Sequence, residues 1–134
     1  MNVKRNFPNS RLRRLRASDN LIKLVSETSL SSNDLIQPLF IKENLEGTEP
    51  IDSMPNISRF SADSVLNEVE DVLNSGVNSI ALFPVIEESK KDDLGKEALN
   101  KSNLICKSIQ SIKKRFPEII IIADVALDPY TYHG

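Results

Sequence analysis

The 134-residue sequence has no tryptophan, a single cysteine, two tyrosines and five phenylalanines. One cysteine, Cys106, can form neither an internal disulfide nor a cysteine-rich zinc site, which indicates a reducing, cytoplasmic setting. No apolar stretch approaches the roughly 20 residues of a membrane span. Basic residues occur near the N-terminus, but no apolar segment follows them, so we expect neither a secretory signal nor a membrane partner.

Acidic residues are absent from the first 16 positions, which carry six Lys and Arg. The chain has 17 Lys and Arg against 19 Asp and Glu, so 11 basic residues remain for the rest, which has a net charge of −8. Such a basic arm is compatible with a partly ordered tail, with docking on an acidic neighbouring subunit, or with nucleic-acid binding. No zinc motif or aromatic platform accompanies the charges, so we expect no nucleic-acid partner. The six residues are Lys4, Arg5, Arg11, Arg13, Arg14 and Arg16.

Three apolar segments are predicted to be strands, and two amphipathic helices separate them. Ser18 is predicted to cap a short helix before the first strand. Ser61 is predicted to begin the first of the two amphipathic helices, and Gly76 to end it. Pro117 prevents continuation of the second. The strands are LIQPLFI at 35–41, SIALFPVI at 79–86 and the run from Ile119, and the second helix carries Leu104, Ile105, Ile109, Ile112 and Phe116.

This alternation predicts right-handed βαβ units and a parallel sheet. Long connectors follow the first two strands, at 42–60 and 87–102, whereas the turns from helix to strand are short. The length of the first connector indicates a functional loop or an inserted hairpin. Long loops at one end of the sheet are typical of the (β/α)8 barrel, a fold of about 250 residues. A three-stranded flavodoxin-like fragment is the alternative. It would leave two strands whose composition suits a buried position as exposed edges of the sheet, which is unfavourable.

The run IIIIADVAL from Ile119 to Leu127 is interrupted by a single carboxylate, that of Asp124. Such a run predicts a strand buried on both faces. A charge there is costly unless it lies at the end of the strand, in a polar site or beside a partner. In α/β proteins that end is where ligands bind, so Asp124 is a candidate functional residue.

Six segments in order resemble the delta-aminolevulinic acid dehydratase (porphobilinogen synthase) family. They are RLRRLR at 11–16, DLIQPLFI at 34–41, PIDSMPNISR at 50–59, ALFPVI at 81–86, KDDLGKEALN at 91–100 and DVALDPYTYHG at 124–134. The resemblance implies an N-terminal arm with a short helix at residues 1–30 and an incomplete (β/α)8 barrel at residues 31–134. It also implies a homo-oligomer, an octamer in the family, in which the arm embraces a neighbouring subunit.

The family condenses two molecules of 5-aminolevulinate into porphobilinogen for tetrapyrrole synthesis. Its imine-forming lysines lie in the later half of the family sequence, so we expect residues 1–134 alone to be inactive. Lys90, Lys91 and Lys96 lie in a charged connector and are interpreted as solvated. The competing hypothesis is a non-catalytic module that binds a partner chain through the basic arm and an open sheet edge.

Asp124 matches an aspartate that lines the active site of the family, where a carboxylate can hold an ammonium group, shift proton equilibria or bind a metal. A hydrogen bond from Asp124 to loop amides is the structural alternative. Zinc-dependent relatives have cysteine at the positions of Ala126 and Asp128, so the segment resembles the zinc-independent branch, often activated by magnesium. Asp128 either reaches such a hard cation or forms the turn before Pro129.

Four other residues are assigned structural roles. His133, the only histidine, is interpreted as a hydrogen-bonding residue of the loop motif. Tyr130 is predicted to pack at the end of the strand, and Cys106 to act as a small hydrophobe. Asn56 stands where the family often has glycine, and it tolerates the same left-handed backbone.

Overall fold

The computed structural model describes residue 8 and residues 13–133. The chain divides into two compact units, residues 1–30 and residues 31–134. In the first unit a 3-10 turn, η1 (Arg14–Arg16), precedes helix α1 (Asp19–Leu24). The Leu21 N–H donates to the Ser18 hydroxyl at 3.3 Å, which confirms the predicted cap. Lys4, Arg5 and Arg11 of the basic arm lie outside the described residues.

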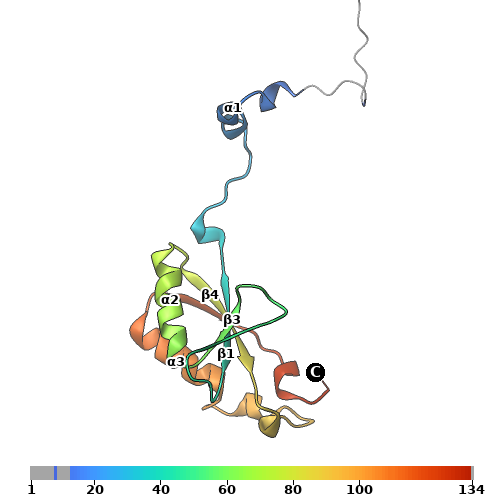
Figure 1. Ribbon diagram of the computed structural model, residues 1–134, viewed down its shortest axis with the longest axis vertical. Coiled ribbons are helices and arrows are strands. Elements are labelled where there is room, and N and C mark those ends of the chain that lie inside the picture. The colour runs from blue at the N-terminus through green and yellow to red at the C-terminus, as the bar shows by residue number, and fades with distance from the viewer. Residues whose placement is uncertain (1–7, 9–12, 134) are drawn as a thin grey trace, which may run out of the picture. The chain divides into compact units, whose positions relative to one another are not determined.

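The second unit contains a five-stranded sheet in the order β2-β3-β1-β4-β5 (Figure 1). The strands β3, β1, β4 and β5 run parallel, and β2 pairs antiparallel with β3. The predicted strands correspond to β1, β4 and β5, and the predicted helices to α2 and α3. The bounds are β1 Gln37–Lys42, β2 Thr48–Pro50, β3 Ser58–Phe60, α2 Ser64–Asn74, β4 Ser79–Val85, α3 Leu104–Arg115 and β5 Ile120–Ala123.

The first long connector forms the hairpin β2–β3, one of the two outcomes that its length indicated. Asn56 has φ 65° in the turn, as its match to a family glycine predicted. Glu49 of β2 accepts from Lys42 of β1 at 2.5 Å and from Arg59 of β3 at 2.7 Å. The sheet therefore has five strands, two more than the three predicted from the sequence. The two additional strands have only three residues each, which is too short to show an alternating pattern.

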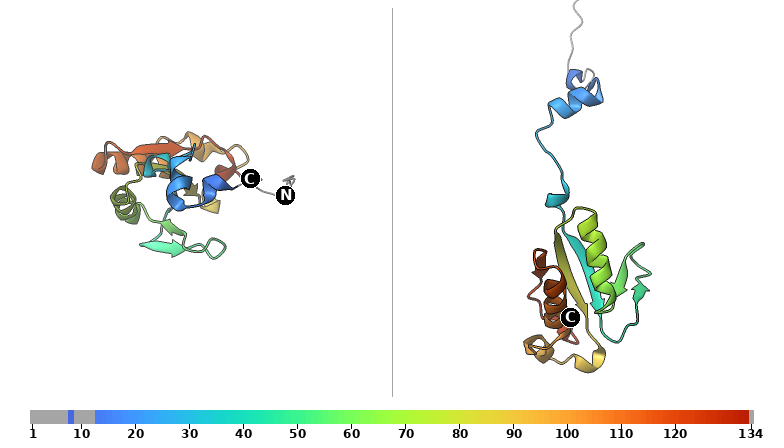
Figure 2. Two further views of the ribbon diagram at one scale, coloured as in Figure 1. Left: turned by 90° about the horizontal axis from the view of Figure 1, so that it is seen from above. Right: turned by 90° about the vertical axis from the view of Figure 1, so that its left-hand side faces the viewer.

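The order of β1, β4 and β5 in the sheet decides between the two predicted folds. These strands lie side by side in chain order, and both α2 and α3 lie on the same face of the sheet (Figures 1 and 2). A flavodoxin-like fragment would reverse direction after its first strands and place helices on both faces. The hairpin β2–β3 lies on the other side of β1. The consecutive strands β1, β4 and β5, with both connecting helices on one face, have the arrangement of a (β/α)8 barrel.

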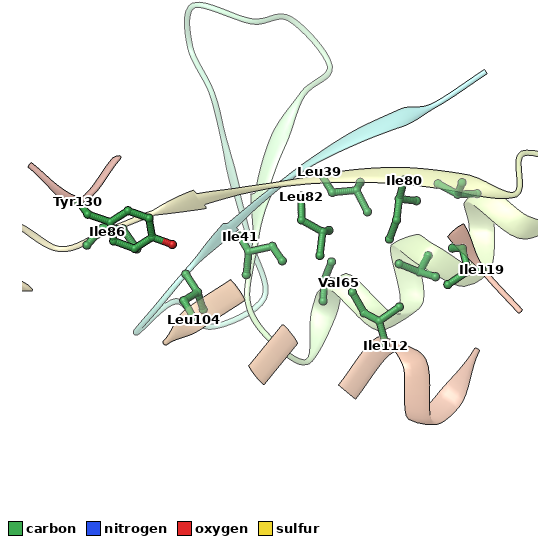
Figure 3. Close-up of a cluster of buried hydrophobic side chains, with 12 residues drawn as sticks. Leu39, Ile41, Val65, Ile80, Leu82, Ile86, Leu104, Ile112, Ile119 and Tyr130 are labelled. Carbon is green, nitrogen blue, oxygen red and sulfur yellow. The ribbon is translucent and has the colours of Figure 1, made fainter. Parts of the chain in front are cut away.

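The core lies between the sheet and the two helices. Alternate residues of β1 and β4 point toward the helices, among them Leu39, Ile80 and Leu82 (Figure 3). They meet Val65 of α2 and Ile112 of α3, which are fully buried. The alternation follows from the two-residue period of a strand, and it leaves the intervening side chains on a face that no described helix covers.

The prediction that the isoleucine run is buried on both faces is wrong for this chain. Ile119 is 2% exposed, whereas Ile120 and Ile122 are 56% and 42% exposed. The reason is that Ile120 and Ile122 point to the face of the sheet that no described helix covers, whereas Ile119 packs in the core on the helix side. The apolar composition of β5 suits burial on both faces, but the helices and strands that this chain places around it decide which side chains are buried.

The ends of α2 follow the predicted signals. The Ser64 N–H donates to the Ser61 hydroxyl at 3.0 Å, and the Ser61 N–H donates to the Ser64 hydroxyl at 2.9 Å. After the helix, Gly76 has φ +86°, and the Val77 N–H donates to the Val72 carbonyl at 3.2 Å. This is the Schellman arrangement, which requires the left-handed conformation at Gly76. No helix among residues 13–133 is long and apolar enough to cross a membrane.

Candidate active site at the carboxyl ends of the strands

The segments that follow β4 and β5 pack against each other at the carboxyl edge of the sheet. The connector after β4 contains the 3-10 turns η3 (Glu88–Lys90) and η4 (Lys96–Leu99), and the segment after β5 contains η5 (Asp128–Tyr130). The Asp92 N–H donates to the Tyr130 carbonyl at 3.2 Å. Gly95 has φ +61°, and a Cβ there would lie 3.4 Å from the Thr131 methyl group. A Cβ there would make only ordinary contact, so it is the left-handed backbone that favours glycine.

Tyr130 anchors the segment after β5. Its side chain is buried and belongs to the hydrophobic core, as predicted for a packing residue. Burial raises the pKa of the Tyr130 phenol, and the nearby Cys106 and Glu97 raise it further. The neutral ring thus fixes the loop that carries Asp124 and Asp128.

Asn103 holds the connector after β4 against α3. Its side-chain oxygen accepts from the Cys106 N–H at 2.8 Å and caps the helix. Its amide group donates to the Ala98 carbonyl at 3.4 Å. Sequence reasoning did not single out Asn103, although an asparagine directly before an apolar helix is a recognised capping signal.

Asp124 follows β5 directly and lines a cavity of about 450 Å³. β5 ends at Ala123, so Asp124 lies just beyond the regular alternation of the strand. Asn103 and Tyr130 line the same cavity, and Asp124 supplies the one carboxylate among the lining residues. No hydrogen bond between described residues uses this carboxylate. Asp124 is exposed, so an ammonium group can reach its carboxylate from solvent.

Asp128 lies in a neighbouring cavity of about 480 Å³, together with Asp93 and His133. Leu127 lines both cavities, so the two predicted site residues are adjacent but are not brought into one cavity. No three His, Cys, Asp or Glu side chains of the described chain lie close enough together to hold a metal ion. Ala126 faces the Asp124 cavity and brings no metal-binding atom. Asp93 was not predicted as a site residue, because only the folding of its connector brings it to the same cavity as Asp128.

Comparison with known proteins gives a family for the chain. A model of the family described as "Delta-aminolevulinic acid dehydratase" matches residues 9–134. The delta-aminolevulinic acid dehydratase of Bradyrhizobium diazoefficiens is 43% identical over 92% of this chain and 35% of that protein. The Bacillus subtilis protein of the same name is 39% identical over 93% of this chain and 38% of that protein.

A solved structure has the same arrangement. It is the delta-aminolevulinic acid dehydratase (porphobilinogen synthase) of Toxoplasma gondii in complex with the reaction product porphobilinogen. The TM-score is 0.86 at 36% identity, over 92% of this chain and 35% of that one. The chain thus spans about a third of the length of the relatives it matches.

Proposed function

Because the chain belongs to the delta-aminolevulinic acid dehydratase family, we propose that it contributes Asp124 and the surrounding strand ends to a porphobilinogen synthase site. That site condenses two molecules of 5-aminolevulinate into porphobilinogen, with loss of two waters. The observation that carries the proposal is the position of Asp124 directly after β5, in a cavity at the carboxyl edge of a barrel-type sheet. The porphobilinogen bound to the similar Toxoplasma gondii protein supports the same substrate class.

The role proposed for Asp124 follows from its surroundings. 5-Aminolevulinate carries an ammonium group, and the exposed carboxylate of Asp124 can form an ion pair with it. The same carboxylate can accept a proton when the amine is needed in its neutral form for imine chemistry. Asp124 is therefore proposed to hold and deprotonate the substrate amine.

The lysines of the connector after β4 are not proposed as imine-forming residues. Lys90 pairs with Glu43, Lys91 pairs with Glu88 at 2.7 Å, and Lys96 pairs with Asp92 at 3.5 Å. Carboxylate partners favour the charged ammonium, whereas a Schiff-base lysine must lose its proton. The resemblance places the imine-forming lysines in parts of the family that this chain does not cover, so the 134-residue chain is expected to be inactive alone.

A magnesium ion is proposed to be held at Asp128 with Asp93. The donor set fits a hard cation, because Mg²⁺ is bound by one or two carboxylates and keeps several waters. It does not fit a thiolate zinc site, because Ala126 and Asp128 bring no sulfur. Asp128 and Asp93 would hold such an ion, which would supply positive charge to this part of the site. We also propose a cytoplasmic location on the basis of the resemblance. The resemblance and the charges of the basic arm support a homo-oligomer joined through that arm, an octamer as in the family.

The proposal is tested by incubating the purified 134-residue chain with 5-aminolevulinate and assaying pyrrole formation with an acidic aldehyde reagent. No pyrrole is expected, and turnover by residues 1–134 alone would contradict the assignment of the imine step to residues outside them. A relative of full family length serves as the positive control.

A second candidate function is supported by the open edge of β5. Ile120 and Ile122 are exposed there, beside backbone groups that no described strand pairs. An unpaired apolar edge favours pairing with another chain. A non-catalytic module of this kind predicts concentration-dependent assembly in light scattering. A monodisperse monomer that unfolds cooperatively would contradict it.

A further inference from the structure

A third cavity, of about 320 Å³, lies between the segment after β1, the turn before α2 and the first turns of α3. It shares no lining residue with the cavities of Asp124 and Asp128. Its volume is at the lower end of the range for small-molecule sites. Three lysines and two carboxylates line it. These residues are Lys42, Lys90, Lys107, Glu43 and Asp63.

Ser108 of α3 lines this cavity and is 1% exposed. Its hydroxyl has no hydrogen-bond partner among the described residues. Leaving a buried hydroxyl unpaired costs about 1–3 kcal/mol, so such groups are normally satisfied by the protein, by water or by a ligand. Ser108 thus brings an unsatisfied hydroxyl to the wall of this cavity.

The lysines of the cavity are not equivalent. Lys42 is paired with Glu49 at 2.5 Å, and Lys90 is paired with Glu43. Lys107 lies one residue before Ser108 and forms no ion pair with another described residue. The positive charge available to a ligand is therefore that of Lys107.

The beginning of α2 adds backbone donors to the same wall. The Ser64 N–H is used by the Ser61 hydroxyl at 3.0 Å. The N–H groups of Ala62 and Asp63, which also line the cavity, take part in no hydrogen bond between described residues. Free amides at the start of an eleven-residue helix favour an anion. The Asp63 carboxylate opposes this effect, so the ligand needs the ammonium of Lys107 in addition to the amides.

From these features we propose that the cavity binds a small molecule through a phosphate group. The phosphate accepts hydrogen bonds from the Ser108 hydroxyl, the Lys107 ammonium and the amides of Ala62 and Asp63. Charge-assisted bonds from lysine and from helix-terminal amides are the contacts that phosphate groups receive in proteins. The site lies outside the one proposed for condensation, so its test does not depend on that reaction.

The experiment titrates inorganic phosphate into the 134-residue chain, with potassium chloride of equal ionic strength as the reference. The melting temperature is expected to rise in a saturable way with phosphate only. In ¹H–¹⁵N NMR spectra, the amide signals of Ala62, Asp63, Lys107 and Ser108 are expected to shift along one binding curve. Absence of saturation, or shifts confined to the basic residues of positions 1–16, would overturn the proposal.

Substitutions separate this site from a general effect of charge. Lys107→Ala is expected to weaken phosphate binding at least tenfold, and Ser108→Ala roughly fivefold, the factor that one hydrogen bond typically contributes. Ser108→Ala removes an unpaired buried hydroxyl, so it should fold without loss of stability when phosphate is absent. Lys114→Ala, on the same helix but outside the cavity, should bind phosphate as the parent does. Equal binding by the Ser108→Ala and parent chains would contradict the proposed site.

Discussion

The rings of Phe40 in β1 and Phe83 in β4 are cross-strand partners, with their centroids 5.6 Å apart and an interplanar angle of 32°. They lie on the face of the sheet that α2 and α3 do not cover. The pair therefore marks the side of the sheet that a closed barrel would turn inward. It also provides a local interaction that can be measured in the chain as it stands.

A double-mutant cycle is expected to give Phe40 and Phe83 a coupling energy of about 0.5–1.5 kcal/mol, the range for aromatic pairs at this separation. The cycle compares Phe40→Leu, Phe83→Leu and the double variant by urea unfolding. Strictly additive effects would mean that the rings are not in contact in solution. Phe60→Leu, combined with Phe83→Leu, is the matched control, because β3 and β4 are not neighbours in the sheet.

The isoleucines at the start of β5 should respond differently to truncation. Ile119→Ala is expected to lower the free energy of unfolding by about 2–5 kcal/mol, because it opens a cavity in the core. Ile120→Ala is expected to change it by no more than about 0.5 kcal/mol, because that side chain is 56% exposed. Similar losses at both positions in denaturant titrations would show that another part of the chain covers β5.

Asn103 is predicted to stabilise α3 through its cap. Asn103→Ala removes the acceptor of the Cys106 N–H and should cost about 1–2 kcal/mol, since it also breaks the link to the Ala98 carbonyl. Ser102→Ala, one residue earlier, is the control and should be close to neutral. Chemical denaturation followed by far-ultraviolet circular dichroism measures both, and a neutral Asn103→Ala variant would contradict the assigned cap.

Glu49 should make the stability of the hairpin depend on pH. Hydrogen bonds from Lys42 and Arg59 hold the pKa of its carboxyl below the ordinary value of 4.5, with the Lys42 bond the larger cause. A lowered pKa in the folded state adds stability that is present above pH 4.5 and is lost as the pH falls toward the folded pKa.

Melting temperatures between pH 3 and pH 7 check this dependence. The Glu49→Gln chain should be less stable than the parent at pH 7, and the difference should shrink as the pH falls below 4.5. Glu46→Gln, in the same connector, is the control and should follow the parent curve. A Glu49→Gln curve parallel to that of the parent at every pH would refute the link.

Much of this fold is predictable because long apolar segments with a clear period specify β1, α2, β4 and α3. The hairpin strands β2 and β3 are not, since pairing with β1 rather than local pattern stabilises three-residue strands. The burial of Ile120 was mispredicted because a strand's composition does not reveal whether its neighbours are in the chain. Asp124 was chosen as a candidate site residue because it is a charge at the end of an apolar run, and its role stays a prediction. Asn103 also carries a local signal, a capping residue before an apolar helix, whereas the meeting of Gly95 with Thr131 depends on the folding of distant segments.

The most direct measurement uses a chimera in which residues 13–133 replace the aligned part of the Toxoplasma gondii relative. We predict that this chimera forms porphobilinogen from 5-aminolevulinate. The Asp124→Asn version, folded to the same extent by circular dichroism, should lose at least about 100-fold in kcat, the contribution expected of a group that transfers a proton. An Asp124→Asn chimera that turns over as fast as its parent would contradict the placement of Asp124 in the catalytic site.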